Sequence, residues 1–459
     1  MNIKNYIKSL IGHKPNGPIQ EFPVKIPSIN KEELLAVKSD EKMITVGLDF
    51  GTHQTKVCVE SKGGVELDYT FVKFEGVNKQ LHYTIPSIIG IGVDKRLRYG
   101  YLSDDFEGDV VRYFKQQAFN TSTETSSADQ ELAIRYSIWY LASIIFDLED
   151  IFGQDFSIQM GAPTDSSHVT TAKQTATRII ASAYKLVEDI FKNDKKKFLE
   201  TELEELIELT EIREYSEEDK EEYQLRVFPE AYACLKPLTS QQKIARGMSL
   251  MIDIGGGTTD ISFFTIEQDT PQVYDFFSIN MGLNFLTCAD EKAPHGIDSN
   301  VKSASEIDMS KKEVFTKKID SICQHISGNL FRELGIQTQI SKMRLYDALK
   351  NRPIVYCGGG STFSTLREVH DTFKEIKHVS EKEWNIQSVP QIEDIIAKSL
   401  CPILSTAYGL AISTVNDDIE MKPFRDIFIH IRNEGENNSN SLSGGMYSGS
   451  LYSDWDAMK

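Results

Sequence analysis

The chain has 459 residues, of which 40% are hydrophobic and 26% charged, a balance typical of soluble globular proteins rather than disordered or fibrous ones. This length exceeds one compact core and predicts two domains, or one domain split into two lobes. The formal net charge is −18, which argues against a general nucleic-acid-binding protein or an anionic-membrane protein. Much of this charge is local, because residues 200–222 hold twelve acids against Arg213 and Lys220.

No segment predicts a membrane span or a secretory signal. The longest largely apolar run, residues 138–146, is far shorter than the roughly 20 residues that a spanning helix needs. Residues 1–15 lack the apolar stretch and small-residue cleavage site of a signal peptide. The six cysteines form no C-x-x-C pair, which predicts buried free thiols in a cytoplasmic protein and argues against a zinc site. They are Cys58, Cys234, Cys288, Cys323, Cys357 and Cys401.

The first half of the chain predicts a leader, then strands, then helices. Residues 1–43 contain four prolines between positions 15 and 27 and predict a leader outside the fold. An apolar run predicts a strand at 43–50, alternating apolar residues predict one at 55–59, and further strands are predicted at 65–74 and 96–101. Helical periodicity predicts long helices at about 129–148 and 165–191. The Glu-rich segment after Lys197 predicts a solvated amphipathic helix that projects from the fold.

The strand pattern restarts at Ser249 and runs through 250–254 and 260–266. A helical stretch follows at 311–334, then an apolar strand at 353–357 that leads into a glycine turn. A last helix is predicted at 392–414. Residues 433–459, rich in Asn, Ser and Gly, predict a disordered tail whose few aromatic residues suit a short docking motif.

One unit occurs twice: a strand that ends in Asp, a turn with Gly and Thr, and a second strand. It covers residues 46–59 and 251–264, with Asp49 and Asp253 in the same place. Glycines in a tight turn let backbone N–H groups approach an anion, while a strand-end Asp repels phosphate unless a cation lies between them. The pair therefore predicts a triphosphate with Mg²⁺, each Asp holding the metal directly or through its waters. Ordinary turn geometry explains either hairpin alone, but not both together with the third glycine turn.

These three elements resemble the actin, sugar-kinase and 70-kDa heat-shock protein superfamily. Residues 48–52 resemble its first phosphate loop, residues 252–260 its second, and residues 354–361 its adenosine loop. The likeness is greatest to the nucleotide-binding domain of the heat-shock chaperones, and it spans roughly residues 44–415. Further similar segments are residues 84–87, 114–116, 161–164, 228–233 and 407–411.

The resemblance implies an α/β, two-lobed actin-like ATPase fold with duplicated ribonuclease H-like lobes. Lobe I would span residues 44–248, with an acidic insert at about 195–225, and lobe II residues 249–395. Residues 396–432 would hold a helix that crosses back between the lobes and a C-terminal segment.

The resemblance also implies a role for each site residue. Lys115 would stabilise charge on the γ-phosphate, while Glu230 and Asp253 would position the attacking water and the metal hydration shell. Asp49, Asp253 and Asp260 would hold Mg²⁺. His53, Phe363 and Ile403 replace a threonine, an arginine and an acidic residue of the family, so ATP is implied without a mode of base recognition. The residues that would line the nucleotide are Gly51, Thr52, His53, Gly255, Gly256, Gly257, Thr258, Thr259, Gly359, Gly360, Ser361 and Phe363.

Three functions follow from the resemblance. The first is an ATP-hydrolysing, chaperone-like switch that acts on a protein partner, because only about 45 residues follow the crossing helix and a peptide-binding sandwich needs about 100. The second is a self-assembling filament ATPase like the bacterial actin relatives. The third is a small-molecule kinase, for which no motif identifies an acceptor site.

Overall fold

The computed structural model describes residues 34, 42–64, 66–77, 79–103, 105–120, 126–163, 169–240, 249–267, 270–287, 307–333, 335, 353–367, 385–388 and 400–414. The tail at 433–459, residues 392–399 of the last predicted helix and nearly all of the leader lie outside these residues. Within the leader only Leu34, Lys42 and Met43 are described. Leu34 is 1% exposed and belongs to the core of lobe I. At this position the expectation of a leader outside the fold is wrong.

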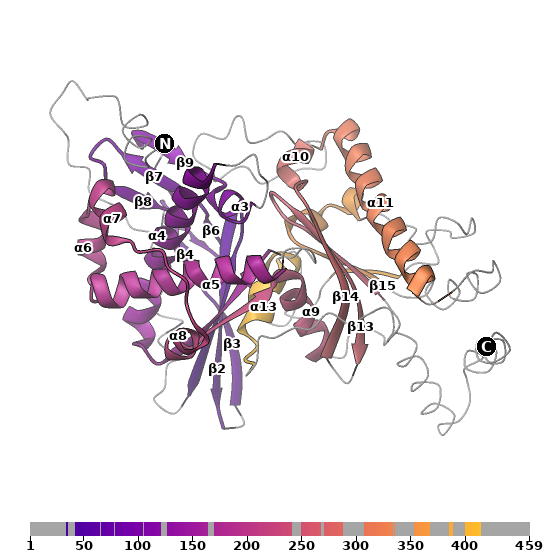
Figure 1. The fold of residues 1–459 in the computed structure, drawn as a ribbon, viewed down its shortest axis with the longest axis horizontal. Helices are drawn as coiled ribbons and strands as arrows, with labels where there is room; N and C mark the ends of the chain where they lie inside the picture. The colour runs from indigo at the N-terminus through magenta and orange to yellow at the C-terminus, as the bar shows by residue number, and fades with distance from the viewer. Residues whose placement is uncertain are drawn as a thin grey trace.

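Two sheets with the same strand order form the centres of two lobes that lie side by side (Figure 1). In each, an antiparallel meander of three strands is followed by two strands that extend the sheet in parallel. The first of these two pairs with the first strand of the meander, and the second pairs with the first of the two. The lobe I sheet has the order β11-β10-β1-β2-β3, with bounds β1 (Met43–Phe50), β2 (Gln54–Gly63), β3 (Glu66–Phe71), β10 (Phe156–Ala162) and β11 (Leu225–Pro229). The lobe II sheet has the order β14-β13-β12-β15-β16, with bounds β12 (Ser249–Ile254), β13 (Thr259–Glu267), β14 (Thr270–Ile279), β15 (Pro353–Cys357) and β16 (Asn385–Ser388).

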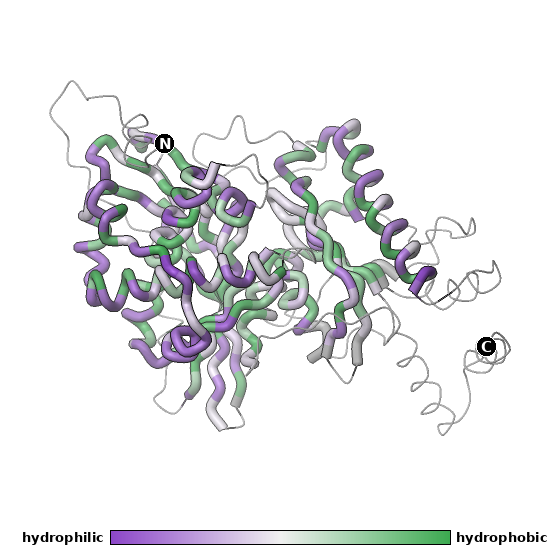
Figure 2. The backbone as a smooth tube through the Cα atoms, viewed as in Figure 1, coloured by the Kyte–Doolittle hydropathy of each residue, from purple (hydrophilic) through white to green (hydrophobic). Residues whose placement is uncertain are grey.

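The repeated topology confirms the α/β, two-lobed actin-like fold. The first strands β1 and β12 are almost wholly buried because each lies inside its sheet, with partners on both edges and helices nearby. Such strands are apolar without alternation, which is the pattern that both sequence segments have. Hydrophobic residues accordingly gather along the strands, whereas α8 (Glu217–Glu222) is hydrophilic over its length (Figure 2).

Smaller strands and the helices complete the lobes. In lobe I the short strands are β4 (Phe74–Glu75), β5 (Leu81–His82), β6 (Ile85–Pro86), β7 (Ile89–Gly92), β8 (Leu97–Tyr99) and β9 (Gly108–Val111). The helices before β12 are α3 (Phe114–Ala118), α4 (Ser127–Phe152), α5 (Val169–Lys185), the π-helical turn η1 (Leu186–Ile190), α6 (Lys195–Glu200), α7 (Leu203–Leu209), α8 and α9 (Glu230–Ser240). The later helices are α10 (Leu283–Thr287), α11 (Met309–Glu333), η4 (Gly359–Thr362), η5 (Ser364–Leu366) and α13 (Cys401–Ala411).

The two lobes exchange helices. Helix α9 follows β11 of lobe I, yet its Ala231, Cys234 and Leu235 pack into a core with β12, β13, β14 and β15 of lobe II. Helix α13 follows lobe II and packs its Leu404 and Ala407 on the lobe I sheet. The sequence boundary at residue 248 therefore does not separate the two packing units.

Helices α9 and α13 meet at backbone distance. A Cβ placed on Gly409 of α13 would lie 1.8 Å from the carbonyl oxygen of Ala233 in α9. Lys236 of α9, 5% exposed, ties the same pair together by donating to the carbonyl oxygen of Ile412 at 2.6 Å and to Thr414 Oγ1 at 3.3 Å. Only glycine permits the close approach at position 409.

The acidic segment corrects a prediction. Residues 200–222 form short helices packed on lobe I rather than one projecting helix, and Leu203 and Leu206 are 1% and 0% exposed in its core. Trp139 of α4 donates its indole N–H to Thr210 Oγ1 at 2.7 Å. The acids face outward, where Glu211 pairs with Lys185 at 2.6 Å. The segment is therefore part of the lobe.

Cys58, Cys234, Cys323, Cys357 and Cys401 are free and buried, as predicted, and Cys288 lies outside the described residues. Among the helices in the described ranges, none has the length and apolar character that crossing a membrane requires.

The packing of the acidic segment predicts that Leu206→Ala destabilises lobe I. Removing a fully buried leucine side chain typically costs about 2–5 kcal/mol. Glu205→Ala, one residue earlier and exposed, is the control and should change the free energy of unfolding by less than about 0.5 kcal/mol. Equal urea midpoints for the two variants would contradict the packed arrangement.

The contact between α9 and α13 predicts that Gly409→Ala destabilises the protein, because the new methyl group overlaps the Ala233 carbonyl. Overpacking of this kind costs about 1–3 kcal/mol. The matched control is Gly328→Ala in α11, where an added Cβ would meet no atom within 4 Å. There, replacing a helix glycine should stabilise by up to about 1 kcal/mol. Thermal unfolding of both variants measures the difference in sign.

Candidate functional site

A cavity of about 510 Å³ lies where the glycine turns of the two lobes face each other. Most of the predicted site residues line it, and they come from both lobes. These residues are Asp49, Gly51, Thr52, His53, Lys115, Glu230, Asp253, Gly255, Gly256, Gly257, Thr258, Asp260, Gly359 and Phe363. We call this space the rear cavity.

Residues 84–87, with the sequence Thr-Ile-Pro-Ser, hold the turn of the first hairpin. Ser87 Oγ donates to the carbonyl oxygen of Gly51 at 2.7 Å, and the Ser87 N–H donates to the carbonyl oxygen of His53 at 2.8 Å. Gly51 itself leaves no room for a side chain, since a Cβ there would lie 2.2 Å from the carbonyl oxygen of Gln54. The turn is thus fixed by contacts that leave its backbone facing the cavity.

The second hairpin and the third glycine turn are built on each other. Gly255 N–H donates to the carbonyl oxygen of Thr258 at 2.9 Å and closes the second turn. Gly358 has a φ of 77°, which favours glycine, and a Cβ there would lie 2.2 Å from Asp253 Oδ1. The Gly358 N–H donates to the carbonyl oxygen of Pro402 at 2.9 Å, which ties this turn to the first turn of α13.

The tips of the two hairpins touch across the cleft. A Cβ on Gly256 would lie 2.6 Å from His53 Cδ2, and one on Gly257 would lie 2.9 Å from Thr52 Cγ2. His53 Nε2 also forms a hydrogen bond with the Asn284 amide of α10. His53 was expected to face phosphate, and here its ring joins the two lobes.

The two hairpins carry different charges at equivalent positions. In register, Asp49 of β1 stands opposite Lys56 of β2, and Asp253 of β12 stands opposite Asp260 of β13. Lys56 Nζ donates to Asp49 Oδ2 at 2.9 Å. The lobe I hairpin is therefore internally neutralised, whereas the lobe II hairpin presents two acids.

The crowded acids have raised pKa values. Burial first, and the Asp49 carboxylate second, raise the pKa of Asp253 to about 7. Burial also raises the pKa of Asp260 well above its usual range, and one of its carboxyl oxygens has no hydrogen-bond partner among the described residues. Burial lowers the pKa of Lys56, but the neighbouring carboxylates, Asp49 foremost, together outweigh burial and leave this pKa raised. The cavity thus favours an added positive charge near Asp253 and Asp260.

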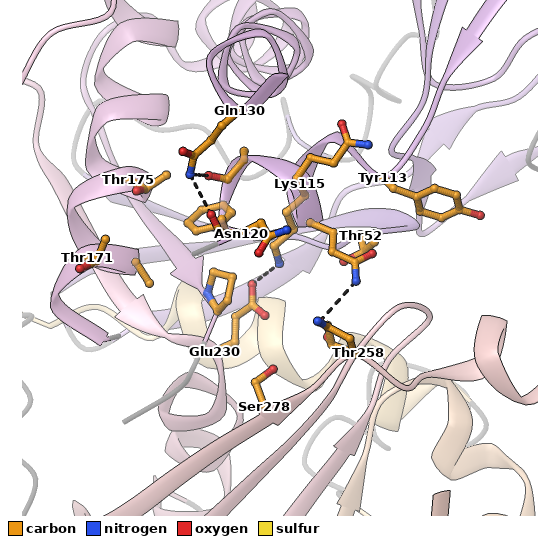
Figure 3. A pocket seen from close by; sticks show the side chains of 17 residues that line it. Thr52, Tyr113, Lys115, Asn120, Gln130, Thr171, Thr175, Glu230, Thr258 and Ser278 are labelled. Atoms are coloured by element: carbon orange, nitrogen blue, oxygen red, sulfur yellow. Dashed lines mark hydrogen bonds and ion pairs between the residues drawn. The ribbon is translucent and has the colours of Figure 1, made fainter. Parts of the chain in front are cut away.

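Lys115 and Glu230 both line the rear cavity, and their side chains point toward each other (Figure 3). Lys115 Nζ donates to Glu230 Oε1 at 2.5 Å, with side-chain exposures of 5% and 12%. Burial is the main cause that raises the pKa of Glu230, and Lys115 opposes it. Gly161 makes room for this carboxylate, since a Cβ there would lie 2.7 Å from Glu230 Cγ.

Three residues expected at the nucleotide do not line the rear cavity. Thr259 is fully buried and donates to the carbonyl oxygen of Met281 at 2.7 Å. Gly360 packs against the Ile254 side chain, and Ser361 Oγ donates to the carbonyl oxygen of Gly358 at 2.8 Å. Thr259, Gly360 and Ser361 therefore shape the turns, because the strand pairing and the short η4 turn direct them into the protein and away from the rear cavity.

Sequence reasoning missed Lys56, which lines the rear cavity. The signal was present in the internal repeat. Asp260 follows Asp253 by seven positions, and Lys56 follows Asp49 by the same seven. Because opposite residues of a hairpin share one face of the sheet, the recognised Asp260 implies that Lys56 also points into the cleft.

The described residues contain no cluster of three or more His, Cys, Asp or Glu side chains arranged to hold a metal ion. Asp49, Asp253 and Asp260 line one cavity but do not form a cage. An ion there would need oxygen ligands from water or from a bound anion.

The raised pKa of Asp253 predicts that Asp253→Asn stabilises the nucleotide-free protein. The folded state binds a proton more tightly than the unfolded chain between the ordinary value of 3.8 and the folded value of about 7. Stability from this group therefore falls as pH rises through that window, and the full penalty applies at pH 8. For a chain of this size, relief of 1 kcal/mol corresponds to a melting temperature about 1–2 °C higher.

The gain of Asp253→Asn should be larger at pH 8 than at pH 5. Asp109→Asn, at an exposed position, is the control and should change little at either pH. A lower melting temperature of Asp253→Asn at pH 8 would show that the surroundings favour the carboxylate.

Comparisons with known proteins add little information about the function of this site. No family model and no curated protein matches the chain. Among solved structures, the chain is similar to the ethanolamine utilization protein EutJ from Carboxydothermus hydrogenoformans, at 14% identity and a TM-score of 0.36, with 83% of this chain and 99% of that chain covered. A likeness at this level carries no argument about activity, so the fold rests on the repeated sheet topology.

Proposed function

We propose that the chain binds ATP with Mg²⁺ between its lobes, hydrolyses the γ-phosphate, and uses the resulting movement of the lobes to act on a protein partner. One observation carries the proposal: the buried Lys115–Glu230 pair lines the same cavity as the turns of the two glycine hairpins. A cation and a carboxylate at this point are the groups that phosphoryl transfer to water needs.

The two hairpins suit the phosphates. Their glycines leave backbone N–H groups accessible, and Thr52 and Thr258 add hydroxyl donors from opposite lobes. Lys56 adds a fixed positive charge, which Asp49 holds in place at 2.9 Å. In this arrangement each lobe contributes donors to the same anion, so the anion favours the closed form.

The acids of the rear cavity suit a site that holds a divalent cation better than one that holds none. Burial raises the pKa values of Asp253 and Asp260, and neighbouring carboxylates raise them further, chiefly Asp49 for Asp253 and Glu230 for Asp260. Mg²⁺ would neutralise part of the phosphate charge, and Asp49 and Asp253 would orient it through its water ligands. This role requires no preformed metal cage among the described residues.

Part of the rear cavity lining suits a nucleobase. This part is apolar and aromatic and comes from the loop after β5, the turn after β15 and the start of α13. Planar rings pack well against such surfaces. The residues concerned are Tyr83, Phe363, Leu400, Ile403 and Leu404.

In the proposed reaction, Glu230 holds the attacking water and accepts a hydrogen bond from it. Lys115 moves from Glu230 to the γ-phosphate and stabilises the charge that develops there. The lobes are joined at the mouth by Gln116 Nε2, which donates to Asn280 Oδ1 at 3.3 Å, and by His53 with Asn284. Loss of the γ-phosphate removes a shared ligand of both lobes, and they part about the exchanged helices.

The role given to Lys115 predicts that Lys115→Ala lowers turnover by about 10²–10³-fold, as removal of one transition-state contact typically does. The ATP dissociation constant should change far less, because the lysine is already paired with Glu230 before nucleotide binds. Gln117→Ala on the same short helix, exposed and outside the rear cavity, is the control and should keep normal turnover.

Phosphate release and ATP binding measured on the same preparations distinguish the two quantities. Normal turnover of Lys115→Ala would contradict the proposed reaction, and a large loss of ATP binding would place the lysine in ground-state recognition instead.

A further inference from the structure

Tyr113 begins the short helix α3 that carries Lys115, and its backbone is strained. Its φ of 59° and ψ of 14° lie in the left-handed region. This conformation costs free energy for a residue other than glycine and persists only where the surroundings impose it. The Tyr113 carbonyl oxygen still accepts the first hydrogen bond of the helix, from the Gln117 N–H at 3.1 Å. The conformation of Tyr113 is therefore built into the start of α3.

The ring of His53, in the first glycine hairpin, packs against the ring of Tyr113. The two ring centroids are 5.3 Å apart and the planes are inclined at 51°. Rings at this separation attract each other. The backbone of His53 is fixed in lobe I, because its carbonyl oxygen accepts from the Ser87 N–H at 2.8 Å. Figure 3 shows the Tyr113 ring pointing away from the Lys115 side chain, so the two residues contact different neighbours.

His53 is joined to lobe II by the Asn284 side chain of α10. The Asn284 amide nitrogen forms a hydrogen bond with His53 Nε2. The backbone N–H of Asn284 donates to the carbonyl oxygen of Gly256 at 2.9 Å. The preceding N–H, of Leu283, donates to the carbonyl oxygen of Gly255 at 3.0 Å. Helix α10 is thus built on the second glycine hairpin, and Asn284 moves with that hairpin.

Helix α3 is anchored in lobe I at a single residue between Tyr113 and Lys115. This residue is Phe114, which is 1% exposed in the core of lobe I. On one side of it Tyr113 contacts His53, and on the other side Lys115 Nζ donates to Glu230 at 2.5 Å. A change in the backbone of Tyr113 therefore turns the first turn of α3 about Phe114 and shifts the Lys115 amine.

We propose that Tyr113 and His53 are positioning residues that place the Lys115 amine according to the closure of lobe II. The inference rests on the proposed ATP hydrolysis and deepens it. In the closed form Asn284 holds His53, and His53 holds Tyr113 in its strained conformation. When the lobes part, the ring contact loses its support, Tyr113 relaxes, and Lys115 withdraws from the phosphate. Hydrolysis is thereby confined to the closed form.

Turnover and ATP affinity separate this role from a general loss of stability. Tyr113→Leu should lower kcat about 10–10²-fold, as displacement of a catalytic group does. The ATP dissociation constant should change little, because Tyr113 lies outside the lining of the rear cavity. Tyr113→Phe keeps the ring and should keep normal turnover. The control, Tyr223→Leu, removes a half-buried ring that stacks on Tyr184 elsewhere in lobe I, and it should also turn over normally.

Normal turnover of Tyr113→Leu, or an equal loss in Tyr113→Phe, overturns the proposal. Tyr113→Gly distinguishes the ring from the backbone, because glycine adopts the left-handed conformation without its cost. Its turnover should fall as far as that of Tyr113→Leu, whereas its melting temperature should fall less. Normal turnover of Tyr113→Gly would show that the backbone alone positions Lys115 and would overturn the role of His53.

The path between the lobes can be tested without nucleotide. Tyr113→Leu and Asn284→Ala should each lower the melting temperature, and the double variant should lose less than the sum of the two because both act through His53. In a His53→Ala background the two losses should add. Additive losses with His53 present overturn the path, whatever the ATPase result. Wild-type protein that hydrolyses no ATP removes the proposed function and with it the positioning role, whereas losses that do not add would still establish the path.

Discussion

The backbone contact between α9 and α13 at Gly409 is the constraint on which the cleft depends. Both helices begin at the cleft, since Glu230 is the first residue of α9 and the first turn of α13 accepts a hydrogen bond from Gly358. Each helix then packs on the sheet of the other lobe. The separation of these two helices therefore sets how far apart the two glycine hairpins stand, and a single added methyl group at position 409 would change it.

The cleft holds acids that its surroundings do not fully compensate. Asp49 has Lys56 and Glu230 has Lys115, whereas the opposed pair Asp253 and Asp260 has no cation of its own at comparable distance among the described residues. Buried like charges raise pKa values and lower the stability of the nucleotide-free fold. Such a site gains most from a ligand that brings positive charge with it, which is the character of a metal–triphosphate complex.

Strong local patterns were predictable, and features set by distant packing were not. The hairpins β1–β2 and β12–β13 and helix α4 lie within a few residues of their predicted bounds because their apolar periodicities are long and regular. The acidic segment was misjudged because an amphipathic pattern does not tell whether its apolar residues, such as Leu203 and Leu206, pack on the rest of the fold, and that is decided by the core of lobe I. Thr259 was misplaced for a similar reason, since motif position alone does not tell which face of a strand a side chain occupies.

The exchange of helices determines how the protein would behave if its chain were cut into two fragments between the lobes. A break within residues 241–248 would leave α9 on the first fragment and α13 on the second. Each fragment would then expose the sheet surface that the other fragment's helix covers, and each would carry a helix that has lost the core residues contributed by the other fragment. Neither half is thus a self-sufficient folding unit. The two halves are complementary, and they can reassemble in trans only if α9 and α13 again pack on each other's lobes.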